Sequence, residues 1–185
     1  MRLGKVRRSD LVMSQAETET ALQDGRVAHF GTVGQDGEPY VIPNLFVYMG
    51  GRVYLHTAKT GHFRRNVEAH PQVCFEVSEL GQTYPYGEFE CDSSASYLSV
   101  IGVGAISIES SDTEKARFFD RFMTKYGDPA WGRPKSFYPR LGEVTVYCID
   151  PSQITGKRIQ LPPPSEQWPA HNRTKSPGAI APRRS

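Results

Sequence analysis

The feature that most constrains the fold of this chain is a run of three strand-like segments joined by very short turns. The segments, rich in β-branched and aromatic residues, span 26–33, 38–49 and 52–57. The turns between them, Gly34-Gln35-Asp36-Gly37 and Gly50-Gly51, place glycine where a tight turn requires positive φ. Because connections this short can join only antiparallel neighbours, the segments are predicted to form an antiparallel sheet.

Three further strands are predicted at 72–80, 97–109 and 143–150, the last with an apolar alternation of approximate period two. Residues 81–95 are polar and rich in turn-forming residues, which predicts a loop. Six antiparallel strands with few helices favour a mainly β fold class, a small β-barrel with peripheral helices.

Three helices are predicted outside the sheet, and two of them have a clear signal at their start. Ser14 and Ser111 are each followed three residues later by a glutamate, which is the pattern of a capping box. Another helix is predicted over Gly61 to His70, before Pro71. In the helix after Ser111, we expect one apolar stripe to face a core, formed by Ala116, Phe119, Met123 and Tyr126.

Length and composition indicate one globular domain with a terminal extension. The chain has 185 residues, and residues 161–185 hold six of its 14 prolines with little apolar periodicity. We therefore expect a domain over 1–160 and a Pro-rich C-terminal arm or tail over 161–185. The formal net charge is only +2, and no apolar run approaches the length of a membrane span. Neither nucleic acid nor a membrane is expected as a partner.

The cysteines and histidines give no indication of a metal site. Cys74, Cys91 and Cys148 form no Cys-x-x-Cys pair, and the five histidines include no His-Glu-x-x-His motif. An odd number of cysteines without a disulfide framework is typical of a reducing compartment. The first ten residues lack the apolar core of a signal peptide, so a cytoplasmic location is expected.

The segment from His56 to Arg65 is the most informative one for function. It leads from a predicted strand into a helix N-terminus and contains two threonines, several cations and Gly61. Helix amides, hydroxyls and cations can together surround a phosphate, and a glycine allows close approach. The composition alone also fits a polar loop with solvated charges, so both interpretations stay open at this point.

The segment Val41-Ile42-Pro43-Asn44 indicates the edge of a sheet. Pro43 cannot donate to a strand ladder, so it marks an edge or a bulge. An edge with an unused carbonyl, with Asn44 beside it, could hydrogen-bond a planar heterocycle. Protection of an edge strand against aggregation explains the proline equally well.

Taken together, these segments resemble the pyridoxamine 5'-phosphate oxidase-like superfamily of FMN-binding split barrels. Within it, they are most similar to the branch of nitroimidazole-resistance-type proteins. The resemblance covers roughly residues 10–160, and the order and spacing of its parts carry it. Those parts are Thr32 to Tyr40, Val41 to Asn44, Val53 to His62, Asn66 to Pro71, Val73 to Phe75, Tyr97 to Gly104 and Thr155 to Arg158.

The resemblance implies a six-stranded antiparallel split barrel that holds FMN at the interface of a homodimer. It implies that the flavin ring is lined by Val41, Ile42, Pro43 and Asn44, and the ribityl-phosphate region by His56 and Thr57. It implies that Lys59, Gly61 and His62 hold the phosphate. Ser99 and Val100 would reach the same flavin from the second subunit, and Lys157 would approach it from the C-terminal strand.

One position departs from the family pattern. The residue after His62, commonly a phosphate-binding lysine in the family, is Phe63 here, and a phenylalanine supplies no charge. Either Lys59, Arg64 or Arg65 replaces that lysine, or FMN binds weakly and another cofactor is preferred. Haem and deazaflavin F420 are the alternatives that the resemblance leaves open.

The function implied is that of an FMN-dependent oxidoreductase acting on a small molecule. The alternative is a non-catalytic flavin- or haem-binding module. The sequence singles out no catalytic acid or base and does not identify the substrate or the electron donor. Vitamin-B6 oxidase activity is disfavoured, because that enzyme's substrate-binding Arg/His motif is not found near the end of the chain.

Overall fold

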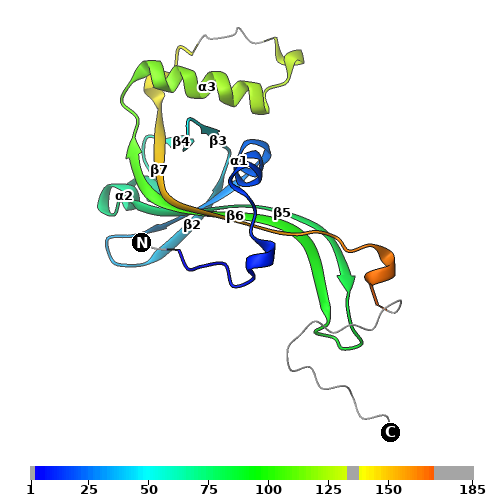
Figure 1. Cartoon of the computed structure of the whole chain (residues 1–185). Helices are drawn as coiled ribbons and strands as arrows, with labels where there is room; N and C mark the ends of the chain where they lie inside the picture. Colours follow the sequence, from blue (N-terminus) through cyan, green and yellow to red (C-terminus); the bar gives the residue numbers. More distant parts are fainter. Residues whose placement is uncertain (1–2, 133–137, 169–185) are drawn as a thin grey trace. The chain divides into compact units, whose positions relative to one another are not determined.

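The computed structural model describes residues 3–132 and 138–168, and a single seven-stranded sheet dominates them (Figure 1). The strand order is β2-β1-β5-β6-β7-β4-β3. The strands are β1 (Ala28–Val33), β2 (Pro39–Asn44), β3 (Phe46–Met49), β4 (Arg52–Ala58), β5 (Gln72–Pro85), β6 (Ser93–Ile108) and β7 (Val144–Ile159). The predicted fold class, mainly β with an antiparallel split-barrel sheet and a few helices, is confirmed.

The sheet has seven strands rather than the predicted six because the segment 38–49 divides at Leu45. Before that residue, β2 pairs with β1, and Asn44 lies opposite Ala28. After it, β3 pairs with β4, and Phe46 lies opposite Leu55. One stretch of β-forming sequence therefore serves two different partner strands, which period-two alternation alone does not reveal.

The predicted loop over 81–95 is wrong in its extent. β5 continues to Pro85 and β6 already begins at Ser93, so the turn is much shorter. Gly81 is a close approach between strands rather than a turn residue, because a Cβ there would collide with Ser96. The turn itself is closed by a 2.8 Å hydrogen bond from the Tyr86 amide to the Asp92 carbonyl.

The described chain forms two compact units. One contains the chain up to Ser78 together with Ser99–Lys157, and the other contains Glu79–Leu98 and the chain from Arg158. In the second unit, the Trp168 amide donates to the Pro85 carbonyl at 3.2 Å. The predicted arm over 161–185 lies mostly outside the described residues.

The three predicted helices are present: α1 (Gln15–Asp24), α2 (His62–Ala69) and α3 (Asp112–Tyr126). At α1 the capping box is complete, since Ser14 Oγ accepts from the Glu17 amide and Glu17 Oε2 accepts from the Ser14 amide. At α3 only the serine half is present, because the Ser111 amide donates instead to the Glu109 carboxylate at 2.8 Å. No helix in the described ranges is long and apolar enough to cross a membrane.

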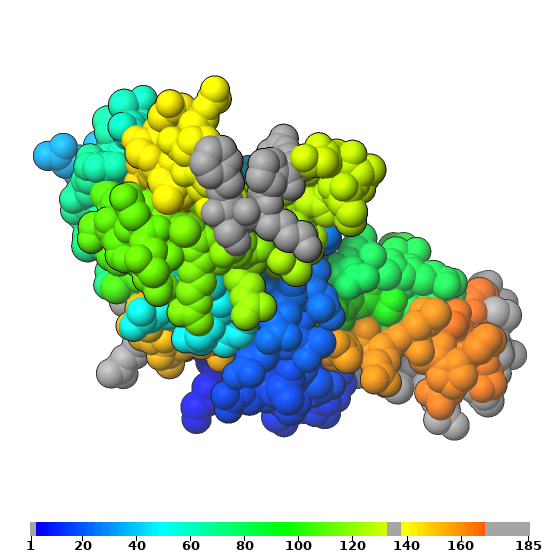
Figure 2. Space-filling model, turned by 90° about the horizontal axis from the view of Figure 1, so that it is seen from above, coloured from blue at the N-terminus to red at the C-terminus, as the bar shows by residue number. Residues whose placement is uncertain are grey.

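The face of β4 and β7 that bears Tyr54 and Val146 is covered by α3, which also contacts β3. The outer side of α3 faces the viewer in Figure 2. The fully buried residue of α3 is Phe118, with Phe119 and Phe122 packed partly beside it. The stripe predicted for this helix contained Phe119 but missed Phe118 and Phe122.

The opposite face of the same strands holds a second aromatic group. The Phe63 ring contacts Phe30 at 6.5 Å and Tyr147 at 5.3 Å between ring centroids, both edge to face. Phe30 and Tyr147 are fully buried and Phe63 nearly so. This packing fixes α2 against the sheet, and with it the start of α2 beside the end of β4.

Candidate functional site

A group of polar side chains lies where β4 and β7 meet α2. Thr57 of β4 and Thr145 of β7 are directly paired residues, so their side chains share one face. The Thr57 hydroxyl lies 3.4 Å from the Tyr147 hydroxyl, and Arg64 Nη1 of α2 donates to Thr145 Oγ1 at 3.2 Å. We call these four residues, Thr57, Arg64, Thr145 and Tyr147, the β4–α2 site.

The start of α2 adds hydrogen-bond donors to this site. Gly61 precedes the helix with φ of 135° and, having no side chain, gives its first turn no side-chain cap. The first amides of a helix point outward without an intrahelical partner, at the positive end of the helix dipole. Lys59 and Arg65 are exposed nearby in sequence. This arrangement of donors and cations suits an anion.

Arg64 is the cation that the structure holds in place. Its Nε lies 2.6 Å from Glu68 Oε1, one turn along α2, and its side chain is 27% exposed. The hydrogen bond to Glu68 raises the pKa of Arg64, and Tyr147 contributes further in the same direction. The guanidinium therefore stays charged and oriented toward the threonine pair.

Phe63, where the family commonly has lysine, belongs to the core. Its side chain is 5% exposed and packs on Phe30 and Tyr147. The positive charge next to the site comes instead from Arg64, the following residue. The departure from the family pattern thus moves the charge by one position along α2 and adds an aromatic contact beneath the site.

His56 does not join Thr57, because successive residues of a strand point to opposite faces. Its ring lies against α3, with centroid distances of 5.8, 5.3 and 5.2 Å to Phe118, Phe119 and Phe122. Nδ1 is buried without a hydrogen-bond partner among the described residues, and burial lowers the pKa of His56. Only the backbone of His56 faces the edge strand, where its carbonyl accepts from Asn44 Nδ2 at 2.9 Å.

The segment Val41–Asn44 lies in β2, at one edge of the sheet, as Pro43 predicted. Val41 is 61% exposed, whereas Ile42 and Asn44 are half-buried. Tyr40 of the same strand stacks on His62 at the start of α2, with ring centroids 4.2 Å apart. The edge strand β2 therefore contacts α2 through His62 and β4 through the His56 carbonyl.

Ser99, Val100 and Lys157 lie apart from this group. Lys157 stands twelve positions beyond Thr145 in β7, which corresponds to up to about 40 Å of strand. Ser99 and Lys157 line one cavity together, while the Val100 side chain is fully buried. Ser99 and Lys157 therefore lie toward the other end of β7 from the β4–α2 site.

The sequence did not single out Thr145, Tyr147 or Tyr40. The signal for the first two was available in the alternation of the strand predicted over 143–150, where Thr145 and Tyr147 fall on one face. Only the pairing of β7 with β4 shows that this face is shared with Thr57. Sequence periodicity does not specify pairing between strands so far apart in the chain.

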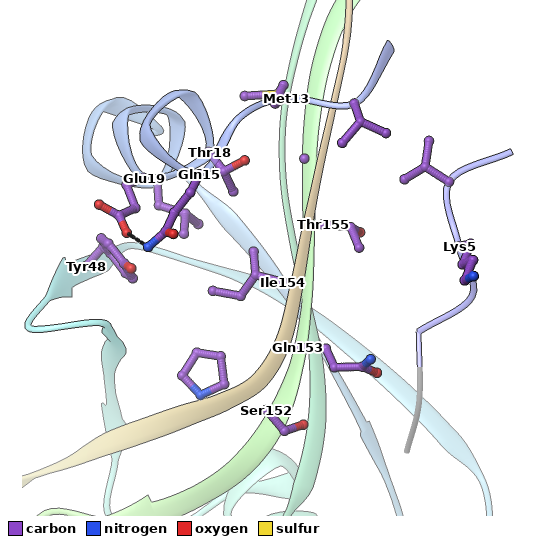
Figure 3. Close-up of a pocket in the computed structure, with 15 residues that line it drawn as sticks. Lys5, Met13, Gln15, Thr18, Glu19, Tyr48, Ser152, Gln153, Ile154 and Thr155 are labelled. Atoms are coloured by element: carbon purple, nitrogen blue, oxygen red, sulfur yellow. Dashed lines mark hydrogen bonds between the residues drawn. The ribbon is translucent and has the colours of Figure 1, made fainter. Parts of the chain in front are cut away.

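A separate cavity of about 700 Å³ lies between α1, β3 and the middle of β7 (Figure 3). Its lining includes Glu19, which accepts a 2.9 Å hydrogen bond from Gln15 Nε2. Burial, and then the charge of Glu19, raise the pKa of Tyr48 on the same wall. None of the predicted site residues lines this cavity, so it is not part of the β4–α2 site.

Comparison with known families shows to which family this chain belongs. The family model described as pyridoxamine 5'-phosphate oxidase matches residues 14–158, well over half of the chain. This chain belongs to that family. The match contains β1 to β6, the three helices and nearly all of β7, and thus every residue of the β4–α2 site. The resemblance stated from the sequence is confirmed at this level.

Solved structures show the same fold at low sequence identity. A candidate 5-nitroimidazole antibiotic resistance protein from Bacteroides thetaiotaomicron is 24% identical, with a TM-score of 0.68, over 80% of this chain and 86% of that one. The flavocytochrome Anf3 from Azotobacter vinelandii is 21% identical, with a TM-score of 0.71, over 98% and 89%. The FAD and heme binding protein from Mycobacterium smegmatis is 18% identical, with a TM-score of 0.64, over 78% and 71%. No curated protein matches the chain significantly.

Proposed function

We propose that this chain is an FMN-dependent oxidoreductase that performs redox chemistry on a small molecule at the interface of a homodimer. The observation that carries the proposal is the β4–α2 site, where paired threonines, a fixed arginine and an uncapped helix start converge in a chain of this family. Flavin-binding proteins among the structural neighbours support a flavin as the ligand.

The residues of the β4–α2 site fit the phosphate of FMN. Arg64 and the first amides of α2 would donate to it, and the Thr145 hydroxyl, which accepts from Arg64, lies beside them. Charge-assisted hydrogen bonds of this kind are stronger than neutral ones. Lys59 adds charge from the exposed segment before Gly61. Phe63 does not weaken this fit, because Arg64 supplies the charge.

The ring of the flavin would extend from the phosphate toward β2. As an edge strand, β2 has backbone groups on one side without a strand partner, and Val41–Asn44 would offer them to the heterocycle. Ser99 and Lys157 lie toward the other end of β7, so we expect them to contact the flavin from the second subunit. This separation supports a site shared between two copies.

Once bound, FMN would supply the redox chemistry, since its ring accepts a hydride or an electron pair and passes it to a second substrate. The chain's own residues would hold the phosphate, orient the ring along β2 and exclude water. Of the titratable side chains beside the β4–α2 site, Glu68 is paired with Arg64 and His62 is stacked on Tyr40, and no proton-transfer role is assigned to either. The protein's contribution is therefore positioning and electrostatics.

A second candidate is a non-catalytic flavin- or haem-binding module, which the descriptions of structural neighbours favour. Two structural neighbours are described as a flavocytochrome and as a FAD and heme binding protein. The same fold thus accompanies haem as well as flavin in those proteins. Deazaflavin F420 is a third cofactor whose binding to the protein should be compared with that of FMN and haem.

The visible spectrum of the purified protein tests the proposal and separates these candidates. We expect bands near ~370 and ~450 nm, a general property of the oxidised flavin ring, and bleaching when a reduced nicotinamide is added. A Soret band, or a flavin that no panel of reductants and acceptors turns over, would support the second candidate. A monomer in size-exclusion chromatography would exclude the shared site.

A further inference from the structure

A small cavity lined in part by Ser99 and Lys157 has charged side chains of one sign only. Its volume is about 290 Å³, and it lies between the N-terminal segment Leu3–Arg8 and one face of β6 and β7. Among the described residues that line it, three are cationic and none is acidic. The cations are Arg7, Arg8 and Lys157.

The face of the sheet that forms the floor of this cavity is set by strand alternation. Ser99 and Ile101 lie two residues apart in β6, and Thr155 and Lys157 lie two residues apart in β7, so each pair shares a face. Val100, between the first two, points to the core and is fully buried. The floor thus offers two hydroxyls, one ammonium group and one apolar side chain.

The N-terminal segment that forms the other wall is held against the sheet at several points. The Leu3 amide donates to Gln153 Oε1 at 2.9 Å. Beyond the segment, Val12 forms an isolated bridge with Lys157, and the Met13 amide donates to the Gly156 carbonyl at 3.0 Å. These contacts fix the positions of Arg7 and Arg8 relative to β7.

The charged side chains that line the cavity are all cationic. Arg8 Nε donates to Asp10 Oδ1 at 2.8 Å, and this contact raises the pKa of Arg8; Asp10 itself lies outside the lining. A lining of three cations and two hydroxyls suits a carboxylate or a phosphate, and Ile101, Leu3 and Val6 suit an apolar group attached to it.

We propose that this cavity binds the anionic group, a carboxylate or a phosphate, of the small molecule on which the flavin acts. Its place beside the flavin rests on the proposed function, in which Ser99 and Lys157 face the cofactor of the second subunit. The phosphate of FMN itself is proposed at the β4–α2 site, more than ten residues away along β7. The anion proposed here is therefore bound beside Ser99 and Lys157 and not at the β4–α2 site of the same chain.

Protein-detected NMR titration of the full-length chain tests this proposal with benzoate, phenyl phosphate and neutral benzyl alcohol as probes. We expect one or both anions to shift the amides of Ser99 and Thr155, and benzyl alcohol to shift neither. Comparing the two anions shows whether a carboxylate or a phosphate is preferred. Binding should weaken as salt is added, because exposed cations are screened.

Matched variants locate the binding. Arg7→Gln and Lys157→Gln should each raise the Kd of the bound anion about tenfold, the effect of losing one charge-assisted contact. Lys5→Gln removes the same charge from the same segment, but Lys5 lines the other cavity and not this one. It should leave the Kd unchanged.

Separate FMN titration of the same samples distinguishes failure of this inference from failure of the proposed function. If the wild-type protein holds FMN but neither anion shifts Ser99 or Thr155, the cavity proposal is wrong and the cofactor proposal stands. The cavity proposal would also be overturned if Lys5→Gln raised the Kd of the anion as much as Arg7→Gln and Lys157→Gln do. If an anion binds as expected and FMN does not bind, the anion site is real and its proposed place beside a flavin is wrong.

Discussion

The two faces of β4 show how one strand can serve packing on one side and binding on the other. His56 and Thr57 are adjacent, yet the His56 ring is enclosed by three phenylalanines of α3 while the Thr57 hydroxyl lies near Tyr147 and α2. Nδ1 of His56 is buried and unpartnered among the described residues. On the other face, Thr57 and Arg64 are partly exposed, whereas Thr145 and Tyr147 are buried, and all four have hydrogen-bond partners.

This difference indicates where stability and binding reside. Burial of aromatic surface on the α3 face contributes folding free energy, since apolar burial is the main favourable term in folding. The Arg64–Glu68 pair beside the β4–α2 site contributes little to stability, because partly exposed ion pairs are worth about 0–1 kcal/mol. Substitutions on the two faces should therefore affect different measurements.

The largest expected effect is on the α3 face. Phe118→Ala removes a fully buried ring between Tyr54 and His56 and should lower the free energy of unfolding by about 3–5 kcal/mol. Urea denaturation monitored by circular dichroism measures this. Trp131→Ala, at a 54% exposed aromatic residue, is the control and should cost under about 0.5 kcal/mol. Similar losses in both variants would contradict the role assigned to the α3 face.

The next effect concerns binding rather than stability. Arg64→Gln should weaken FMN binding by about 1.5–3 kcal/mol, roughly tenfold to a hundredfold in Kd, because a charged donor to the phosphate is lost. Arg65→Gln changes the net charge equally at an exposed neighbouring position and should change the Kd little. Fluorescence titration of FMN measures both. Weaker binding only in the Arg65 variant would assign the phosphate contact to that residue.

The pH dependence of stability should come from the α3 face through His56. Burial lowers its pKa in the folded protein below the ordinary value of 6.5, so the unfolded chain binds a proton more readily. Stability is therefore full above about pH 6.5 and is lost as the pH falls toward the folded pKa, with a slope of up to ~1.4 kcal/mol per pH unit.

Urea midpoints at pH 7.5 and 5.5 check this dependence. His56→Leu should reduce the loss of stability between the two pH values, because no buried imidazole remains to be protonated. His70→Gln, at the exposed end of α2, should retain the wild-type loss. An unchanged loss in the His56 variant would show that other groups govern the acid sensitivity.

The smallest expected effect is at the threonine pair. Thr145→Val removes one hydroxyl that accepts from Arg64 and should weaken FMN binding by about 0.5–1.5 kcal/mol. Thr145→Ser keeps the hydroxyl and should restore most of the affinity. If the serine variant binds as weakly as the valine variant, the methyl group and not the hydroxyl matters at this position.

Much of the fold was predictable from local signals. The tight turns at Gly34–Gly37 and Gly50-Gly51 and the capping box at Ser14 specify their structures within a few residues. The long hairpin of β5 and β6 was missed because Gly81 looks like a turn residue when its facing strand is unknown. The division of 38–49 at Leu45 likewise depends on which strand each half pairs with.

The site was predicted in part for the same reason. The hydroxyls, cations and glycine around Thr57 and Gly61 are close together in the sequence, so their residue types and spacing alone indicate an anion site. Thr145 joins it only through strand pairing, and His56 leaves it because its side chain points to α3. The role of Ser99 and Lys157 depends on a second copy of the chain and stays a prediction.

The most direct test of the central claim compares FMN with riboflavin, which lacks the phosphate, in equilibrium titrations of the cofactor-free protein. If the β4–α2 site holds the phosphate, the wild-type protein should bind FMN at least about a hundredfold more tightly, the value of one or two charge-assisted contacts. This difference should shrink in Arg64→Gln and persist in Arg65→Gln. Equal affinities of the wild-type protein for FMN and riboflavin would contradict the account.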